Sequence, residues 1–214
     1  PKSLVPIGNF PFIHYQLKHI KKQGINEVVI SVGHLKEKII EHVGSGKDYG
    51  LNVSYINDGD EPLGTGGAIK KSTIKFKESF FVIYGDSFLP IDFGSILETY
   101  NSSSLLALMT IYKNNNLYDK SNIDFKNGKI IEYNKKDIKK NLTYIDYGLS
   151  IVNKKIFENY DLGVRFDLSN LFELLICDNL VAVHEVYERF YEVGSLNGIN
   201  EMKKFISKNF AKGI

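Results

Sequence analysis

The chain has 214 residues, 43% of them hydrophobic and 24% charged, which is typical of a globular domain that can bury a core. Its 27 basic and 25 acidic residues give a formal charge of +2, which argues against a chain-wide basic surface and hence against a nucleic-acid partner. The sequence has no apolar run of about 18 residues and no signal-peptide pattern, so we expect a soluble protein of the cytoplasm with no membrane partner.

Helical and strand patterns alternate in the first half of the chain. Ile13, Leu17 and Ile20 recur at positions i, i+4 and i+7, which predicts a helix that ends at Gly24. The further elements expected in this half are a strand at 28–33, a helix at 36–43, strands at 53–56 and 80–84, and a short helix that begins after Gly67. Strands that are separated by helices predict right-handed crossovers and a mostly parallel sheet.

The second half mixes longer strands with two helices. The elements expected here are strands at 105–112, 123–125, 130–133, 144–152 and 180–186, a helix at 168–177, and a closing helix around Met202 and Phe205. Lys126-Asn127-Gly128 is a good hairpin turn between two of these strands. Cys177, the only cysteine, ends an apolar run and is expected to be buried; a lone cysteine excludes an internal disulfide and suits a reducing compartment. We predict a single α/β domain, residues 1–214, with a three-layer core and a small β appendage.

Two segments combine glycine with groups that suit phosphate or metal chemistry. Gly85-Asp86-Ser87 follows the strand at 80–84, and ligands of open α/β sheets bind beyond the carboxyl ends of the strands. Asp86 is therefore a candidate metal ligand, although an Asp after a strand is more commonly a turn or cap residue. Three of the four residues Gly64–Gly67 are glycines, so their N–H groups can receive a phosphate or the edge of a base; a tight turn is the alternative.

Glu192 is a third candidate for ligand binding. It follows the last expected strand, stands between Tyr191 and Val193, and precedes the closing helix. By local pattern alone, an exposed surface Glu is the alternative. The basic candidates are Lys2, Lys135 and Lys136, each of which would ordinarily be a surface charge.

Taken in order, these segments resemble the nucleotidyltransferases that activate sugar 1-phosphates. The two most specific likenesses are Glu61–Ala68, which is very similar to a segment of bacterial members that act on heptose, mannose and N-acetylmuramic acid phosphates, and Gly85–Ser87, which matches the family's metal-binding strand end. Further likenesses lie at 1–7, 24–28, 130–136, 144–152 and 191–195. The family's N-terminal strand and Gly-X-Gly-Thr-Arg loop have no counterpart in residues 1–214.

The resemblance implies a three-layer, Rossmann-like fold with a mostly parallel mixed central sheet. It implies an enzyme that joins a nucleoside triphosphate to a sugar 1-phosphate and releases pyrophosphate. GTP and a heptose or mannose phosphate are the favoured substrates. A homo-oligomer is compatible with the sequence. The cofactor implied is Mg²⁺, held by Asp86 and Glu192. The residues implied for catalysis are Lys2, Asp86 and Lys136; for nucleotide binding, Lys2, Leu63, Gly64, Gly66, Gly67 and Asp86; and for the sugar, Lys136, Asp146, Tyr147 and Gly148.

Four residues differ from those that family members usually carry. Glu192 replaces an Asp, Lys135 a Glu, Asp146 an Asn and Ser169 a Glu. These differences imply an unusual sugar or a divergent pocket. Two rival functions stay open: a non-catalytic regulatory homologue, to which Glu192 and Ser169 give weight, and a metal-dependent glycosyltransferase that consumes an NDP-sugar and would share the strand-end Asp. The Gly64–Gly67 segment argues against the glycosyltransferase.

Overall fold

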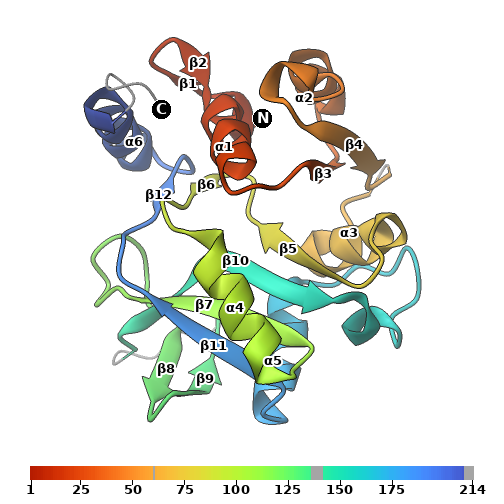
Figure 1. The fold of residues 1–214 in the computed structure, drawn as a ribbon, viewed down its shortest axis with the longest axis vertical. Helices are drawn as coiled ribbons and strands as arrows, with labels where there is room; N and C mark the ends of the chain where they lie inside the picture. The colour runs from red at the N-terminus through yellow and green to blue at the C-terminus, as the bar shows by residue number, and fades with distance from the viewer. Residues whose placement is uncertain (60, 136–141, 210–214) are drawn as a thin grey trace. The chain divides into compact units, whose positions relative to one another are not determined.

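The computed structural model describes residues 1–59, 61–135 and 142–209, and its chain contacts divide into two compact units. Unit 1 comprises residues 1–57, 84–90 and 189–214, and unit 2 comprises residues 58–83 and 91–188. Figure 1 shows the elements of both units. Each unit is described separately, and the expected single domain remains a prediction.

Unit 1 is built from three distant stretches of the chain. Its helices and longer strands are α1 (Phe12–Lys22), β3 (Glu27–Val32), α2 (Lys36–Val43), β4 (Asn52–Asn57) and α6 (Leu196–Asn209), and its two-residue strands are β1 (Pro6–Ile7), β2 (Phe10–Pro11), β6 (Ser87–Phe88) and β12 (Tyr191–Glu192). β3 and β4 pair in parallel, as expected for strands joined by a helix. β6 and β12 pair antiparallel with Glu192 opposite Ser87, so residues about a hundred positions apart become neighbours.

Helix α1 supplies buried side chains to both apolar clusters of unit 1. Phe12 and Tyr15 belong to a cluster that includes Met202 of α6. Ile13 and Leu17 belong to a second cluster with residues of α2 and β4. The helix pattern in the sequence predicted α1 correctly, since apolar side chains three or four positions apart lie on the same side of a helix.

Unit 2 contains a mixed sheet with helices packed on it. Its elements are α3 (Gly64–Ser72), β5 (Ser79–Ile83), α4 (Phe93–Ser103), β7 (Ala107–Lys113), β8 (Ile123–Lys126), β9 (Lys129–Tyr133), β10 (Tyr144–Asn153), α5 (Leu168–Cys177) and β11 (Val181–Val186). β11 runs parallel to β7, whereas β10 pairs antiparallel with both β5 and β7. β5, β7 and β11 therefore share one direction and β10 reverses it, which confirms the expected mixed α/β architecture. The hairpin β8–β9 also forms as expected.

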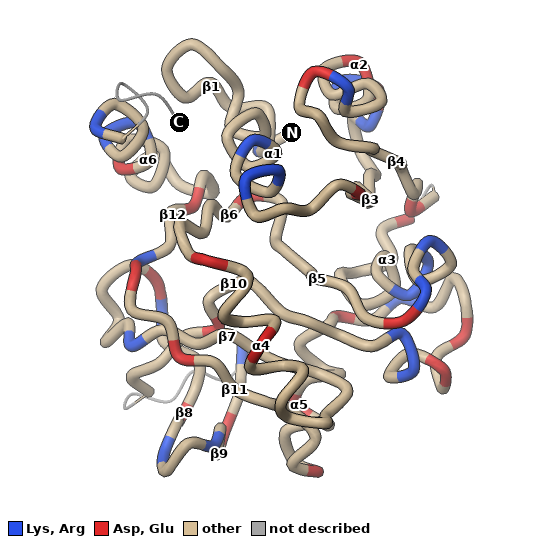
Figure 2. Tube along the Cα trace, in the orientation of Figure 1, with Lys and Arg blue, Asp and Glu red and all other residues tan. Residues whose placement is uncertain are grey.

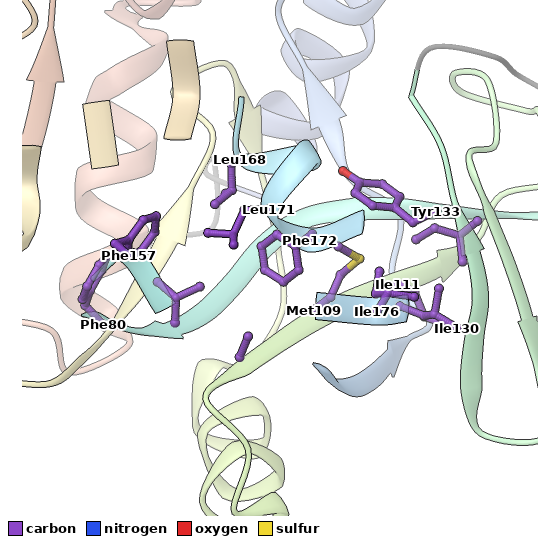
Figure 3. Packing of buried hydrophobic residues seen from close by; sticks show 13 residues of the cluster. Phe80, Met109, Ile111, Ile130, Tyr133, Phe157, Leu168, Leu171, Phe172 and Ile176 are labelled. Atoms are coloured by element: carbon purple, nitrogen blue, oxygen red, sulfur yellow. The ribbon is translucent and has the colours of Figure 1, made fainter. Parts of the chain in front are cut away.

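The largest apolar cluster of unit 2 lies between α5 and the sheet. Leu168, Leu171, Phe172 and Ile176 of α5 pack with Met109 and other strand residues, as Figure 3 shows. The α5 residues follow a spacing that places them on one helical face. Full burial of side chains of this size stabilises a fold by about 1.5–3 kcal/mol each, so this cluster fixes the position of α5.

Helix α4 was not expected from the sequence. Its start is capped by Asp92, whose Oδ2 accepts a hydrogen bond from Ser95 N at 3.0 Å. The buried residues Phe93, Ile96 and Tyr100 recur at helical spacing, but the intervening Thr and Ser residues weaken the helical pattern. The capping Asp was the available signal, because Asp is among the preferred N-cap residues.

The predicted burial of Cys177 is wrong, because its side chain is exposed. Cys177 is the last residue of α5, and the neighbouring Ile176 takes the buried position in the cluster. Acidic and basic residues are interspersed along elements of both units, for example on α2 (Figure 2). None of the described helices has the length and apolar character needed to span a bilayer.

Candidate active site

The strand end at Asp86 meets the start of the chain in unit 1. Lys2 Nζ lies 3.3 Å from Asp86 Oδ2, in an ion pair whose side chains are 63% and 37% exposed. Next to it, the backbone N–H of Val193 donates to the carbonyl of Asp86 at 3.0 Å. Residues from three separate stretches of the sequence therefore gather at this strand end.

Glu192, the last residue of β12, lies beside the first turn of α6, where a Cβ atom at Gly198 would meet its carboxylate. Its Oε2 accepts from the N–H of Gly194, and its Oε1 accepts from the Ser195 hydroxyl at 2.7 Å. Ser195 Oγ in turn accepts from Gly198 N at 3.0 Å. A carboxylate is favoured at this end of a helix, because the N-terminal N–H groups carry a partial positive charge.

Gly194 marks the place where two of the predicted side chains, those of Glu192 and Lys2, come together. A Cβ atom at this glycine would lie 2.6 Å from Glu192 Oε2 and 3.4 Å from Lys2 Nζ. Both groups therefore surround the same backbone position, and Lys2 also holds Asp86. The structure thus brings Lys2 together with Asp86 and with Glu192, and the predicted roles of these residues toward phosphate and metal stay predictions.

Gln16 was missed by the sequence analysis and supports this site from α1. Its Nε2 donates to the carbonyls of Tyr84 at 3.1 Å and Ser87 at 2.7 Å, on either side of Asp86. The Gln16 residue is only 9% exposed. A signal was available, because a polar residue stands on the apolar face of α1 between Ile13 and Leu17, and buried polar groups require partners.

The glycine-rich segment of unit 2 forms the first turn of α3. Gly66 N and Gly67 N both donate to the carbonyl of Phe166, at 2.9 and 3.2 Å, and Phe166 N donates to the Leu63 carbonyl at 3.0 Å. The helix begins at Gly64, earlier than the predicted start after Gly67, so these glycines lie within α3 and not before it, and their N–H groups belong to its first turn. They bond to a distant carbonyl of the same unit, a partner that the local sequence does not indicate.

Thr65 ties the same segment to the start of α5. Its hydroxyl accepts a hydrogen bond from Leu168 N at 2.9 Å across 103 positions of sequence. The aromatic ring of Phe166 covers Gly66 closely enough to exclude a side chain there, and it stacks on Tyr160 with ring centroids 4.2 Å apart. The glycines are thus required by close packing against the 160–168 region.

Replacing Gly67 with Ala is expected to destabilise the protein by about 1–3 kcal/mol, the usual cost of overpacking. A Cβ there would lie 2.6 Å from the Val164 carbonyl oxygen and 3.0 Å from Leu63 Cβ, and a backbone carbonyl cannot move aside easily. Urea unfolding measures the loss. Gly85→Ala is the control, since a Cβ at Gly85 meets nothing within 4 Å. Equal stability of the two variants would contradict the packing argument.

Asp146 is the most connected residue of the expected sugar strand. Its side chain is 3% exposed and its Oδ2 lies 2.9 Å from Lys135 Nζ. The same oxygen accepts from the Tyr133 hydroxyl at 2.9 Å, and Oδ1 accepts from Gly148 N at 3.0 Å. Lys135 and Tyr133 were not among the predicted sugar residues, although they lie one and three positions before Lys136, which is outside the described residues.

The neighbouring residues of β10 have different environments. Tyr147 is 2% exposed and its ring lies 6.2 Å from that of Tyr112, so its side chain belongs to the interior. Gly148 adopts φ +96° where the register of the β10–β7 pairing shifts. Burial and the nearby Glu185 carboxylate raise the pKa of Tyr144 at the start of the strand. The predicted role of Tyr147 and Gly148 toward a sugar stays a prediction.

Comparison with known proteins identifies the family to which the chain is similar. The sequence model of the family described as "Nucleotidyl transferase" matches residues 1–207. The chain is 31% identical over 173 residues to the D-glycero-alpha-D-manno-heptose 1-phosphate guanylyltransferase of Aneurinibacillus thermoaerophilus, covering 80% of this chain and 74% of that protein. The protein of the same name from Campylobacter jejuni is 31% identical over 174 residues, with coverage of 81% and 76%.

Solved structures share the fold. The crystal structure of HddC from Yersinia pseudotuberculosis complexed with GMP-PN has a TM-score of 0.77 at 23% identity, and the match covers 96% of this chain and 90% of that one. The inositol-1-phosphate CTP transferase of T. maritima has a TM-score of 0.74 at 18% identity, with coverage of 98% and 88%. The family match over residues 1–207 and the identity to the two guanylyltransferases show that the chain belongs to the nucleotidyl transferase family, among the transferases that act on sugar 1-phosphates.

Proposed function

We propose that this protein couples a nucleoside triphosphate, with GTP favoured, to a sugar 1-phosphate of the heptose or mannose type, giving an NDP-sugar and pyrophosphate. The observation that carries the proposal is the position of Lys2 in unit 1, which pairs with Asp86 and lies with Glu192 around Gly194. The preference for GTP and heptose rests on the two guanylyltransferases that are 31% identical to this chain.

The proposed reaction is an in-line attack of the sugar-phosphate oxygen on the α-phosphorus, with pyrophosphate as the leaving group. The attacking oxygen is already ionised at neutral pH, so the reaction needs no general base. Catalysis then depends on positioning and on neutralising negative charge. Lys2 suits this task, because its ammonium is exposed and can exchange the Asp86 carboxylate for a phosphate oxygen.

Mg²⁺ is the cofactor that we propose, with Asp86 and Glu192 as its protein ligands. Mg²⁺ prefers oxygen ligands and usually takes one or two carboxylates while keeping several waters. The residues present fit this ligand preference, because two carboxylates, those of Asp86 and Glu192, lie beside the Lys2 ammonium. Asp86 already has a cation as its partner. When bound, the ion would supply neutralisation of phosphate charge. Gln16 holds the strand end on both sides of Asp86 and keeps the carboxylate in place.

The test is pyrophosphate release with Mg²⁺ across the common nucleoside triphosphates and a panel of sugar 1-phosphates. Release that requires both one triphosphate and one sugar phosphate is the expected result, and it would name both substrates. Nucleotide binding without release under any combination would count against the enzyme and favour a regulatory homologue. Consumption of an NDP-sugar without pyrophosphate would favour a glycosyltransferase.

A further inference from the structure

The Glu192 carboxylate accepts a hydrogen bond at each of its oxygens. Oε1 accepts from the Ser195 hydroxyl at 2.7 Å, and Oε2 accepts from the backbone N–H of Gly194. Glu192 is partly buried, whereas Ser195 is exposed. A glutamate side chain turns about several bonds, and fixing it in one conformation costs entropy. These two contacts therefore restrain the carboxylate within unit 1 before any ligand binds.

Two glycines leave the space that this carboxylate occupies. A Cβ atom at Gly194 would lie 2.6 Å from Glu192 Oε2, and a Cβ atom at Gly198 would overlap Oε1 and the carbonyl oxygen of Glu192. Gly198 is buried within α6, although glycine is a poor helix former. A larger residue at either position would displace the carboxylate or the helix, so the two glycines form a cradle for Glu192.

Ser195 joins this cradle to α6. Its carbonyl accepts from Ile199 N and its Oγ accepts from Gly198 N, each at 3.0 Å, as in an N-cap residue. A hydroxyl has one proton and two lone pairs, so Ser195 can accept from Gly198 and donate to Glu192 at the same time. The orientation of the carboxylate is thus tied to the start of a 14-residue helix.

The held carboxylate keeps the capacity to bind a cation. The two oxygens of an ionised carboxylate offer about four lone-pair sites, and the two contacts with Gly194 and Ser195 use one on each oxygen. Glu192 stands opposite Ser87 in the pairing of β12 with β6, and Val193 N donates to the Asp86 carbonyl at 3.0 Å. Restraining Glu192 therefore also fixes it relative to the strand end that carries Asp86.

We propose that Ser195 is a positioning residue for Glu192, and that its hydroxyl sets the affinity of the site for a divalent cation without itself being a ligand. The inference rests on the proposed function, whose metal site it deepens. Glu192 stands where family members usually carry Asp, so its side chain is longer and has one more bond to restrain. Gly194 and Gly198 accommodate the extra length, and Ser195 restrains it.

A competing interpretation is that Ser195 only caps α6. Serine is a preferred N-cap residue, and the hydrogen bond from Gly198 N serves that purpose. The two interpretations differ in whether the effect of Ser195 on metal binding requires Glu192. If Ser195 positions the carboxylate, Ser195→Ala has nothing to misplace once Glu192 is removed. If Ser195 only holds the helix, its loss weakens the site equally with and without the carboxylate.

The experiment measures Mn²⁺ binding to the protein without substrates, by the electron paramagnetic resonance signal of the free ion. Mn²⁺ prefers the same oxygen ligands as Mg²⁺. Ser195→Ala is expected to raise the Kd for Mn²⁺ about 3- to 10-fold, the range for the loss of one hydrogen bond. Ser195→Thr, which keeps the hydroxyl, should stay within about twofold of the wild type. Glu192→Ala should raise the Kd further, and the double variant Ser195→Ala/Glu192→Ala should bind as Glu192→Ala does.

Ser207→Ala is the matched control, because Ser207 lies on the same helix and its hydroxyl donates to the Lys204 carbonyl at 2.9 Å. It should leave the Kd for Mn²⁺ unchanged. Urea unfolding reports the capping role separately, and Ser195→Ala should cost the same stability with and without Glu192. An unchanged Kd in Ser195→Ala, or an equal further rise when Ser195→Ala is added to Glu192→Ala, would overturn the inference. A wild-type protein that binds no Mn²⁺ would overturn it as well.

Pyrophosphate release separates this inference from the proposed function. If the wild-type protein releases pyrophosphate, Ser195→Ala should raise the Mg²⁺ concentration for half-maximal turnover by a factor similar to that of the Kd for Mn²⁺. Release with an unchanged Mg²⁺ requirement and an unchanged Kd would refute the inference alone. If no combination of substrates releases pyrophosphate, a Kd for Mn²⁺ that depends on Ser195 only when Glu192 is present would still support the positioning role.

Discussion

Replacement of Asp86 by Ala is expected to lower kcat by about three orders of magnitude or more, with the protein still folded. The loss corresponds to about 4 kcal/mol of transition-state stabilisation, a typical magnitude for removal of a group that neutralises phosphate charge or holds a metal. The fold should tolerate the change, because the carboxylate is 37% exposed and its ion pair with Lys2 is in contact with solvent. Such exposed pairs contribute little to stability.

The measurement is single-turnover and steady-state pyrophosphate release under a titration of Mg²⁺, alongside a thermal unfolding curve. Asp86→Asn gives a second variant of nearly the same shape that lacks the charge, and it should lose a comparable part of kcat. Glu41→Gln, which removes an exposed carboxylate from α2 of the same unit, serves as the control. Turnover near the wild-type rate in Asp86→Ala would refute the assignment of Asp86 to the catalytic site.

The substitution Phe172→Ala is expected to destabilise the protein by about 3–5 kcal/mol, the usual cost of emptying a buried aromatic position. Phe172 is 1% exposed and belongs to the cluster that joins α5 to the sheet of unit 2, where Figure 3 shows it among Leu168, Leu171 and Met109. The loss combines the apolar surface returned to water with the cavity that rigid neighbours leave behind.

Urea unfolding followed by far-UV circular dichroism gives the free-energy change. Leu174→Ala is the matched control, because Leu174 lies on the same helix but is 60% exposed; its removal should change stability by no more than about 0.5 kcal/mol. Similar losses for Phe172→Ala and Leu174→Ala would contradict the assignment of this helical face to the core. Since α5 begins at the contact with Thr65, the Phe172 variant should also loosen the glycine-rich segment.

The sequence predicted elements well where burial follows a regular period. α1 and α5 place apolar residues on one helical face, and β3 is rich in Val and Ile, so each could be predicted from its own residues. α4 was missed although its buried residues follow a helical spacing, because the Ser and Thr residues between them have low helix propensity. The exposure of the Cys177 side chain was also not predicted, because the helical pattern defines buried and exposed positions least well at the last residue of a helix.

The candidate site depends partly on contacts that no local pattern contains. Asp86 and Glu192 were found from their places at strand ends and from the resemblance to sugar-phosphate nucleotidyltransferases. Their approach depends on the pairing of β6 with β12, and the Lys2–Asp86 ion pair spans 84 positions. The sequence therefore indicated which groups to expect, and the tertiary structure determined their distances.

The sequence by itself determined the alternation of helices and strands, the mixed α/β class and the identity of the charged groups at the strand ends, because these depend on side-chain periodicity and residue type. Only the tertiary structure decided which of these groups form hydrogen bonds and ion pairs with one another. Examples are the Phe166 carbonyl that takes the N–H groups of Gly66 and Gly67, and Asp146, which holds Lys135. The physical reason is that a hydrogen bond or ion pair requires two groups within about 3–4 Å, and chain folding sets that distance for residues far apart in sequence.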